Sequence, residues 1–217
     1  MINNKLKIVI DILMTIVFIL LMCNQVTGVF AHEILGISII ILFTMHQILN
    51  INYYKNLFKG KYNKLRTAYV IINSLLLIMM IIMIISAMLI SQYTLKFLNL
   101  SNDLLGRELH IISSYIIYML IGLHMGLHYN SIVKMKKQNQ IILNIFMCLY
   151  GLVFGIQGFI KKEFITKVTL QNLYPIYSED NIIMLLIDYT GILVMFVMLG
   201  YGIYNLLKLK GKSGKNE

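Results

Sequence analysis

The 217-residue chain has few charged residues, a single proline and no tryptophan. Charged residues make up only 13% of it and hydrophobic residues 59%, and its mean hydropathy is +0.77. Apolar runs longer than about eighteen residues recur along the chain, and a helix of that length crosses a bilayer. The composition therefore excludes a water-soluble domain and predicts a polytopic membrane protein.

The sequence also lacks the motifs of several cofactor classes. It has no C-x-x-C-H motif, which excludes covalently attached haem. Its two cysteines, Cys23 and Cys148, are expected at different depths, so neither a disulfide nor an iron–sulfur centre is predicted. No G-x-G-x-x-G or G-x-x-x-x-G-K motif is present, and the loops are too short for a nucleotide or flavin domain. Such chemistry would belong to a partner protein.

Six apolar segments predict an all-α fold with about six transmembrane helices in a single integral membrane domain, residues 1–217. Two lysines precede the first segment, as in a signal peptide. No small-residue cleavage site follows it, so we interpret this segment as a membrane span. The predicted spans are residues 6–27, 31–52, 68–92, 109–131, 139–160 and 182–207.

The net charge of +10 is explained by topology more simply than by binding to nucleic acid. Fourteen of the nineteen lysines and arginines lie in the N-terminal segment, the second and fourth connections and the C-terminal tail. By the positive-inside rule these parts face the cytoplasm, which places both termini there. We therefore predict a multi-pass protein of the cell membrane, surrounded by lipid and without a nucleic-acid partner. The abundance of isoleucine, asparagine and lysine indicates a bacterial origin.

All five histidines lie in two of the apolar segments, and four of them repeat one spacing. His32 and His46 are fourteen residues apart, as are His110 and His124. Fourteen residues make four helical turns less about 40°, so each pair stays on one helix face, about 21 Å apart along the axis. An isolated histidine in an apolar helix is often a packed residue. Two matched pairs indicate ligands instead, because ionisable groups within a membrane are costly and usually functional.

The two histidine-bearing spans run in the same direction in this topology, so their histidines can pair by depth. His32 and His110 are expected near the outer face, and His46 and His124 near the inner face. Two axial ligands at each of two depths are what two stacked bis-histidine haems require. We therefore predict a membrane cytochrome b with two haems b per chain.

His128 is an alternative inner ligand. It lies eighteen residues, or five whole turns, after His110 and so shares the ligand face. Paired with His46, it would be displaced in depth by about 6 Å. We therefore predict His124 as the inner ligand and His128 as a contact to haem propionates.

Small and charged residues beside the histidines are candidates for further cofactor contacts. Gly36 follows the outer histidine of the second span by one turn, and Gly122 and Gly126 flank the inner histidine of the fourth. A porphyrin could approach the backbone at such positions, but the same G-x-x-x-G spacing also serves helix packing in membranes. Arg107 could pair with haem propionates or remain a solvated loop charge.

Short motifs surround the histidines in both segments. The matching residues are Thr27-Gly28, His32-Glu33-x-Leu35-Gly36, His46 and Leu49-Asn50 in the first segment, and Arg107-x-x-His110 and Gly122-Leu123-His124-x-Gly126-Leu127-His128 in the second. Together they resemble the flavinylation-associated cytochrome family, over roughly residues 24–131, about half of the chain. Two expected family residues differ here: Tyr53 stands in place of a tryptophan and Ala87 in place of a glycine.

This resemblance implies a small integral membrane di-haem cytochrome b that passes electrons across the bilayer. It implies His32, His46, His110 and His124 as the haem-iron ligands and residues 24–131 as the haem-binding core, with two additional helices in residues 139–207. It also implies a partner outside the cytoplasm, a flavoprotein with covalently attached flavin.

We therefore expect an electron-transfer subunit of a respiratory chain rather than a stand-alone enzyme, with quinone as a further candidate partner. The alternative is a membrane transporter or binding protein for zinc, copper or iron that uses the same histidines. His124 and His128, one helical turn apart, have suitable spacing for it. Against it, His32-Glu33 does not continue as H-E-x-x-H. A purely structural membrane anchor would leave the matched histidines without a role.

Overall fold

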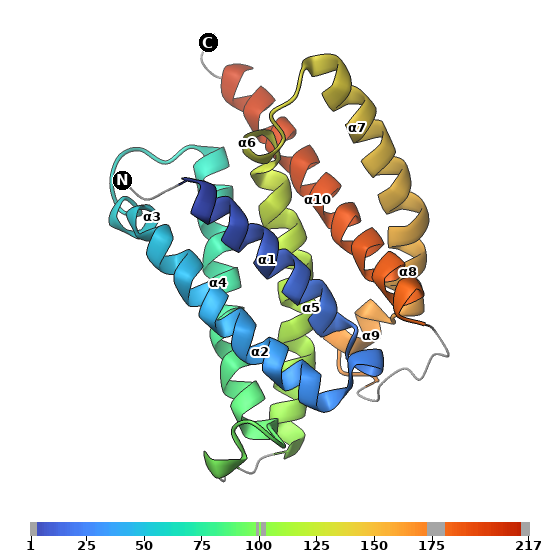
Figure 1. Ribbon diagram of the computed structural model, residues 1–217. Coiled ribbons are helices and arrows are strands. Elements are labelled where there is room, and N and C mark those ends of the chain that lie inside the picture. The colour runs from blue at the N-terminus through green and yellow to red at the C-terminus, as the bar shows by residue number, and fades with distance from the viewer. Residues whose placement is uncertain (1–3, 99, 101–102, 173–180, 214–217) are drawn as a thin grey trace.

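The computed structural model describes residues 4–98, 100, 103–172 and 181–213, and within these ranges it contains helices and no strand. Long apolar segments form helices because a backbone within a membrane must satisfy its own hydrogen bonds. The helices, shown in Figure 1, are α1 (Asn4–Met22), α2 (Asn24–Leu49), α3 (Ile51–Lys55), α4 (Lys64–Ile90), η1 (Lys96–Leu98), α5 (Asp103–Leu127), α6 (Tyr129–Ile132), α7 (Lys137–Tyr150), η2 (Gly151–Gly155), α8 (Ile156–Lys161), α9 (Phe164–Val168) and α10 (Ile182–Ser213).

Five helices are long and apolar enough to cross a membrane. They are α2, α4, α5, the continuous α7–η2–α8 helix and α10. α1 has 19 residues and is not among them, because it carries Lys5, Lys7 and Asp11. The all-α prediction is thus confirmed, with five helices that could span a membrane among the described residues, and a sixth span remains a prediction.

Several predicted boundaries were wrong by a few residues. The first helix ends at Met22 rather than near residue 27, and the chain turns at the fully buried Cys23. α2 follows at once but contains a break at Gly28, whose φ of 78° is accessible to glycine and strained for other residues. α5 begins at Asp103, six residues earlier than expected, and ends at Leu127, so that His128 caps the short α6.

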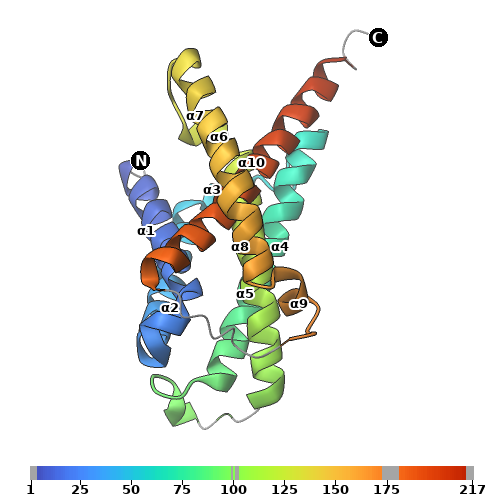
Figure 2. The ribbon, with the colours of Figure 1, turned by 90° about the vertical axis from the view of Figure 1, so that its right-hand side faces the viewer.

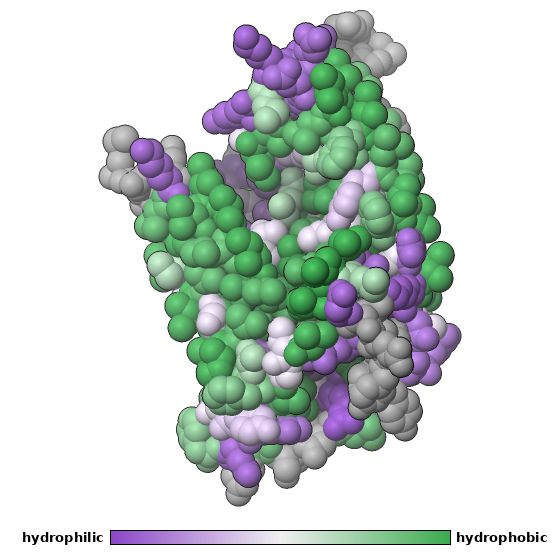
Figure 3. All heavy atoms as spheres, turned by 45° about the vertical axis from the view of Figure 1, so that its right-hand side comes forward, coloured by the Kyte–Doolittle hydropathy of each residue, from purple (hydrophilic) through white to green (hydrophobic). Residues whose placement is uncertain are grey.

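The helices form two layers (Figures 1 and 2). The α1–α2 hairpin makes one layer and the α4–α5 pair the other, with α10 crossing obliquely and α7–α8 at the side. The start of α1, the end of α10, α3 and α6 lie toward one end of the bundle, and the placement of both termini in the cytoplasm remains a prediction. Hydrophobic residues form a broad band over the surface, and hydrophilic residues gather at its two ends (Figure 3). A band of this kind suits contact with lipid.

α5 lies at the centre because α4 and α10 both pack closely against it. Glycines make the approach of α10 possible: a Cβ added at Gly126 would lie 2.7 Å from the Tyr201 backbone nitrogen and 2.8 Å from the Gly200 Cα. A Cβ added at Gly122 would likewise overlap the Cβ of Phe196. The Tyr118 hydroxyl adds a buried hydrogen bond to the Tyr189 carbonyl, at 2.8 Å.

The α1–α2 layer meets the α4–α5 layer mainly through side chains at mid-height. α2 makes no backbone approach to α4 or α5, among the described residues, comparable to that between α4 and α5. The shared hydrophobic core there includes Phe18, Ile39, Met80 and Ile117. Ile39 and Ile117 are almost fully buried, and each lies halfway in sequence between two histidines of its helix. An apolar layer therefore separates the two histidine levels.

Replacing Gly126 with alanine tests the α5–α10 contact. The new Cβ would meet backbone atoms of α10, which cannot move aside, so we expect a loss of about 1–3 kcal/mol of stability. Thermal unfolding in detergent, followed by circular dichroism, should show the lowered midpoint. Gly202→Ala is the matched control on α10, because nothing lies within 4 Å of its added Cβ. Equal midpoints for the two variants would contradict the packing role.

Candidate functional site

The structure brings the rings of His32 of α2 and His110 of α5 together, nearly at right angles, across the two layers. Their ring centroids are 6.0 Å apart, with 74° between the ring planes. We call this pair the outer level, a name that follows the predicted topology. His32 and His110 were expected at the same depth, and the structure does place them side by side.

The inner level contains His46, His124 and His128. His124 and His128 have ring centroids 4.8 Å apart, and His128 also lies against the Tyr69 ring at 4.7 Å. His46 is close enough to act electrostatically on both histidines of α5, as does Asp11. His46 and His124, the second pair predicted to lie at one depth, thus belong to the same cluster of interacting polar side chains.

Three of the four predicted ligands have an oxygen atom from a neighbouring helix beside Nδ1. Asp11 Oδ1 lies 2.7 Å from His46 Nδ1, and Asn73 Oδ1 lies 2.8 Å from His124 Nδ1. Ser86 Oγ is 3.4 Å from His110 Nδ1.

These contacts decide which ring nitrogen can bind a ligand. An ionised carboxylate and an amide oxygen can only accept, so the histidine Nδ1 must carry the hydrogen. Nε2 of a neutral ring is then left with its lone pair. Metal-bound histidines usually have this arrangement, in which a second hydrogen bond fixes the tautomer and the ring orientation.

At His46 the Nε2 side has a further neighbour. Asn50 Nδ2 lies 3.4 Å from it and also donates to the His46 carbonyl at 2.9 Å. Lys7 Nζ in turn donates to Asn50 Oδ1 at 3.1 Å. A contact of 3.4 Å is weak and would yield to a stronger partner for Nε2.

His32 differs from the other three. Its Nδ1 is buried and has no hydrogen-bond partner of normal geometry in the described part of the chain, although the Leu21 backbone lies near the ring. A buried polar atom without a partner is rare and costs free energy. The polar ring is held there by the surrounding structure rather than by its own hydrogen bond.

Glu33, next to His32, fixes the outer end of α2 to the end of α4. Its carboxylate accepts hydrogen bonds from three consecutive backbone N–H groups and two hydroxyls. The donors are Gln92 N at 2.6 Å, Tyr93 N at 3.2 Å, Thr94 N at 2.7 Å, Ser91 Oγ at 2.9 Å and Thr94 Oγ1 at 2.8 Å. Because this contact joins the two layers, it sets the depth of His32 relative to the α4–α5 pair.

The predicted glycine contacts need a correction. Gly122 and Gly126 pack against α10, so of the two uses that their spacing allows, helix packing is the one observed. Gly36 behaves differently: no atom lies within 4 Å of an added Cβ, so space is open beside it, one turn from His32. Arg107 is exposed at the start of α5, and its predicted contact to propionates remains a prediction.

Another group of charged residues lies where α8 and α9 meet α10. The nearly buried Asp188 has its Oδ2 atom 3.1 Å from Lys161 Nζ and 3.4 Å from Lys162 Nζ. Burial lowers the pKa of Lys167 in α9, and the nearby Glu163 partly offsets this effect. Lysines and carboxylates thus lie close together at this end of the bundle.

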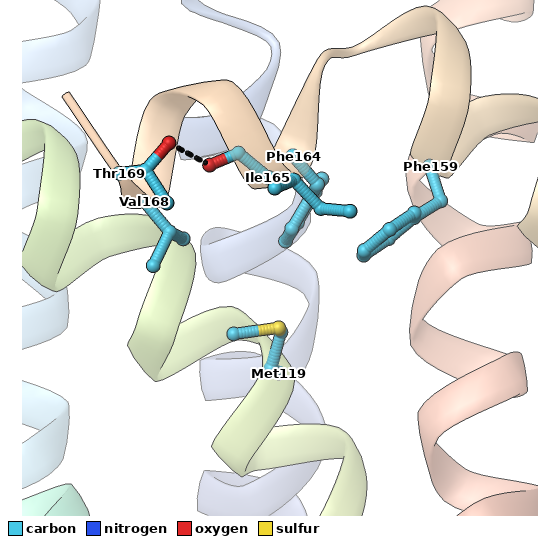
Figure 4. A pocket seen from close by; sticks show the side chains of 6 residues that line it. All are labelled: Met119, Phe159, Phe164, Ile165, Val168 and Thr169. Atoms are coloured by element: carbon cyan, nitrogen blue, oxygen red, sulfur yellow. Dashed lines mark hydrogen bonds between the residues drawn. The ribbon is translucent and has the colours of Figure 1, made fainter. Parts of the chain in front are cut away.

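An apolar pocket of about 130 Å³ lies between α5 and α9 (Figure 4). Its one hydroxyl, from Thr169, donates its hydrogen to the Ile165 carbonyl, so only the hydroxyl oxygen is left to accept from a ligand. The other lining residues are Met119, Phe159, Phe164, Ile165 and Val168. These side chains offer no free donor to a quinone carbonyl, and the quinone partner stays a prediction.

No group of three or more His, Cys, Asp or Glu side chains is arranged to hold a metal ion among the described residues. Comparison with protein-family models, with curated proteins and with solved structures gave no significant match. Any functional assignment therefore depends on the chain's own geometry.

The oxygen atoms around the histidines were not predicted from the sequence. Asp11, Asn73 and Ser86 each approach a predicted ligand, and Glu33 anchors its helix. Asn73 and Ser86 are polar interruptions of the apolar α4, separated by thirteen residues, nearly the histidine spacing. This spacing was a signal in the sequence. If the helix that carries Asn73 and Ser86 runs antiparallel beside a histidine-bearing helix, the two residues lie at the depths of its two histidines.

Glu33→Gln tests the anchor of α2. The amide keeps one acceptor oxygen but loses the charge and the second acceptor, so we expect the free energy of unfolding to fall by about 2 kcal/mol. We also expect faster hydrogen exchange at the amides of residues 92–94. Glu108→Gln, which removes a carboxylate from the same end of the bundle, is the control. Unchanged exchange at residues 92–94 would show that the anchor contributes nothing.

Proposed function

We propose that this chain is a membrane electron-transfer protein that holds two haems b, one between His32 and His110 and one between His46 and His124. The observation that carries the proposal is the pairing of the His32 and His110 rings across two helix layers, together with an oxygen atom beside Nδ1 in three of the four predicted ligands. Haem b supplies a one-electron couple at each level when bound.

The distance between the outer rings supports the proposal. Two imidazoles that share one metal ion, each with a metal–nitrogen bond of about 2.0 Å, would have ring centres about 6 Å apart. The centroids of His32 and His110, which would hold the outer haem, are 6.0 Å apart. The open space beside Gly36 and the absence of a close α2–α5 backbone approach leave room for a flat ring beside them.

At the inner level the tautomer supports His124 as the ligand. Asn73 Oδ1 holds Nδ1 of His124, which leaves Nε2 available, and His46 has the same arrangement through Asp11. His128 lies beyond the last residue of α5 and stacks between Tyr69 and His124. It remains the alternative ligand and a candidate contact to propionates.

The residues of the chain then have separate tasks. The histidines bind, the oxygen atoms of α1 and α4 orient them, and the Glu33 anchor fixes the relative depth of the layers. Ile39 and Ile117 keep polar groups and water out of the region between the levels. Electron transfer across the bilayer depends on these positions and not on a substrate site in this chain.

The identity of the partners belongs to the same proposal. The resemblance of residues 24–131 to the flavinylation-associated cytochromes favours an extracytoplasmic flavoprotein with covalently bound flavin, and quinone is the candidate on the membrane side. The protein would work as a subunit between them in the bacterial cell membrane.

A reduced-minus-oxidised visible spectrum of the detergent-purified protein, with haem extracted and counted, is the first experiment. We expect two low-spin haems b per chain. His110→Ala and His124→Ala should each retain only one, whereas His128→Ala should retain both. Bound zinc or copper in place of haem would favour the metal-transport alternative, and loss of haem in His128→Ala but not in His124→Ala would exchange their roles.

A further inference from the structure

The two histidine levels differ in the charge of the groups that contact the rings. His46 has the Asp11 carboxylate at Nδ1, whereas His110 and His124 have the neutral oxygens of Ser86 and Asn73. A carboxylate at Nδ1 makes the imidazole a more basic ligand than a neutral acceptor does. The asymmetry therefore lies at the inner level.

Other charges near the two levels contact the rings less directly than Asp11 does. Glu33 places a negative charge near His32 at the outer level, but its oxygens accept from the backbone and hydroxyls of residues 91–94 and not from the ring. Lys7 reaches the inner level only through Asn50, to which it donates at 3.1 Å. Asp11 contacts the His46 ring directly, so its effect is the larger.

The position of Asp11 adds to its influence. It lies about two turns into α1, and its electrostatic effect extends to His124 and His128 on the opposite layer. Its side chain is 53% exposed although it is paired with His46. The surface is hollowed between the α1–α2 layer and α10 (Figure 3).

We propose that Asp11 is a positioning residue that lowers the reduction potential of the inner site below that of the outer site. The proposal rests on the di-haem function given above. A negative charge and a more basic axial ligand both favour the oxidised iron. The electron shared by the two sites then resides mainly at the outer level, which favours electron flow from the inner face to the outer face.

The test is a potentiometric titration of Asp11→Asn, with both midpoints recorded. Asparagine keeps the acceptor oxygen and the size but removes the charge. We expect the equilibrium of the inner site to move toward the reduced form at least tenfold, which is about 59 mV for a one-electron couple. The outer midpoint should not move. Repeating the substitution in the His110→Ala background, which retains only the inner haem, identifies the site that shifts.

A control variant that moves the carboxylate to another position distinguishes an electrostatic effect of Asp11 from a structural one. In Asp11→Asn combined with Asn73→Asp, the carboxylate is moved from His46 to His124 within the same level. We expect the inner midpoint to return toward the wild-type value, and Asp11→Glu to stay close to it. A purely structural role for Asp11 predicts no such recovery.

The outcomes distinguish this inference from the proposed function. Absence of haem b in the wild-type protein would overturn the function itself. Two haems with midpoints unchanged in Asp11→Asn, or an equal shift of both midpoints, would leave the function intact and overturn the role of Asp11. Haem content and the His46-dependent low-spin electron paramagnetic resonance signal show whether each variant is fully loaded.

Discussion

In the low dielectric of a bilayer, a polar group without a partner costs several kcal/mol, and this cost constrains every histidine in the chain. The protein meets the constraint by giving most of its intramembrane polar groups a partner on another helix. Asp11 and His46 join α1 to α2, and Asn73 and His124 join α4 to α5. These contacts stabilise the layers and orient the rings in the same step. Removal of either partner therefore affects both the fold and the site.

The packing of α5 determines which of its faces is free for function. Gly122 and Gly126 bring one face into close contact with α10, and α4 covers another. What remains is the face that carries the histidines, directed at α2. α2 is held by α1 and by the Glu33 anchor rather than by its own close packing on α5. A site between the two layers needs helices whose backbones stay apart. The glycines of α5 bring its backbone close to α10 and not to α2, so the space between α2 and α5 is left for side chains.

The sequence allowed the histidine levels to be predicted but not their surroundings. The fourteen-residue spacing depends only on helical geometry, and it correctly placed His32 opposite His110. The chain turn at Cys23 and the early end of α5 were missed, because hydropathy does not resolve where an apolar helix stops. The roles of Asp11 and Asn73 depend on which helices become neighbours, and that is a property of tertiary packing. The spacing of Gly122 and Gly126 fits either contact with a cofactor or helix packing. Only the position of α10 shows that these glycines pack against a helix.

Between the two levels, each histidine-bearing helix carries a buried isoleucine. Ile39 and Ile117 lie seven residues from each histidine of their own helix, so that both helices present histidine, isoleucine and histidine at equal intervals. Seven residues are close to two helical turns, which keeps all three side chains on one face. Both isoleucines are almost fully buried, so this layer excludes water at mid-membrane. A chain of ligands that carries an ion needs polar groups at short intervals, and on the histidine face of each helix the isoleucine interrupts any such chain midway between the two histidines.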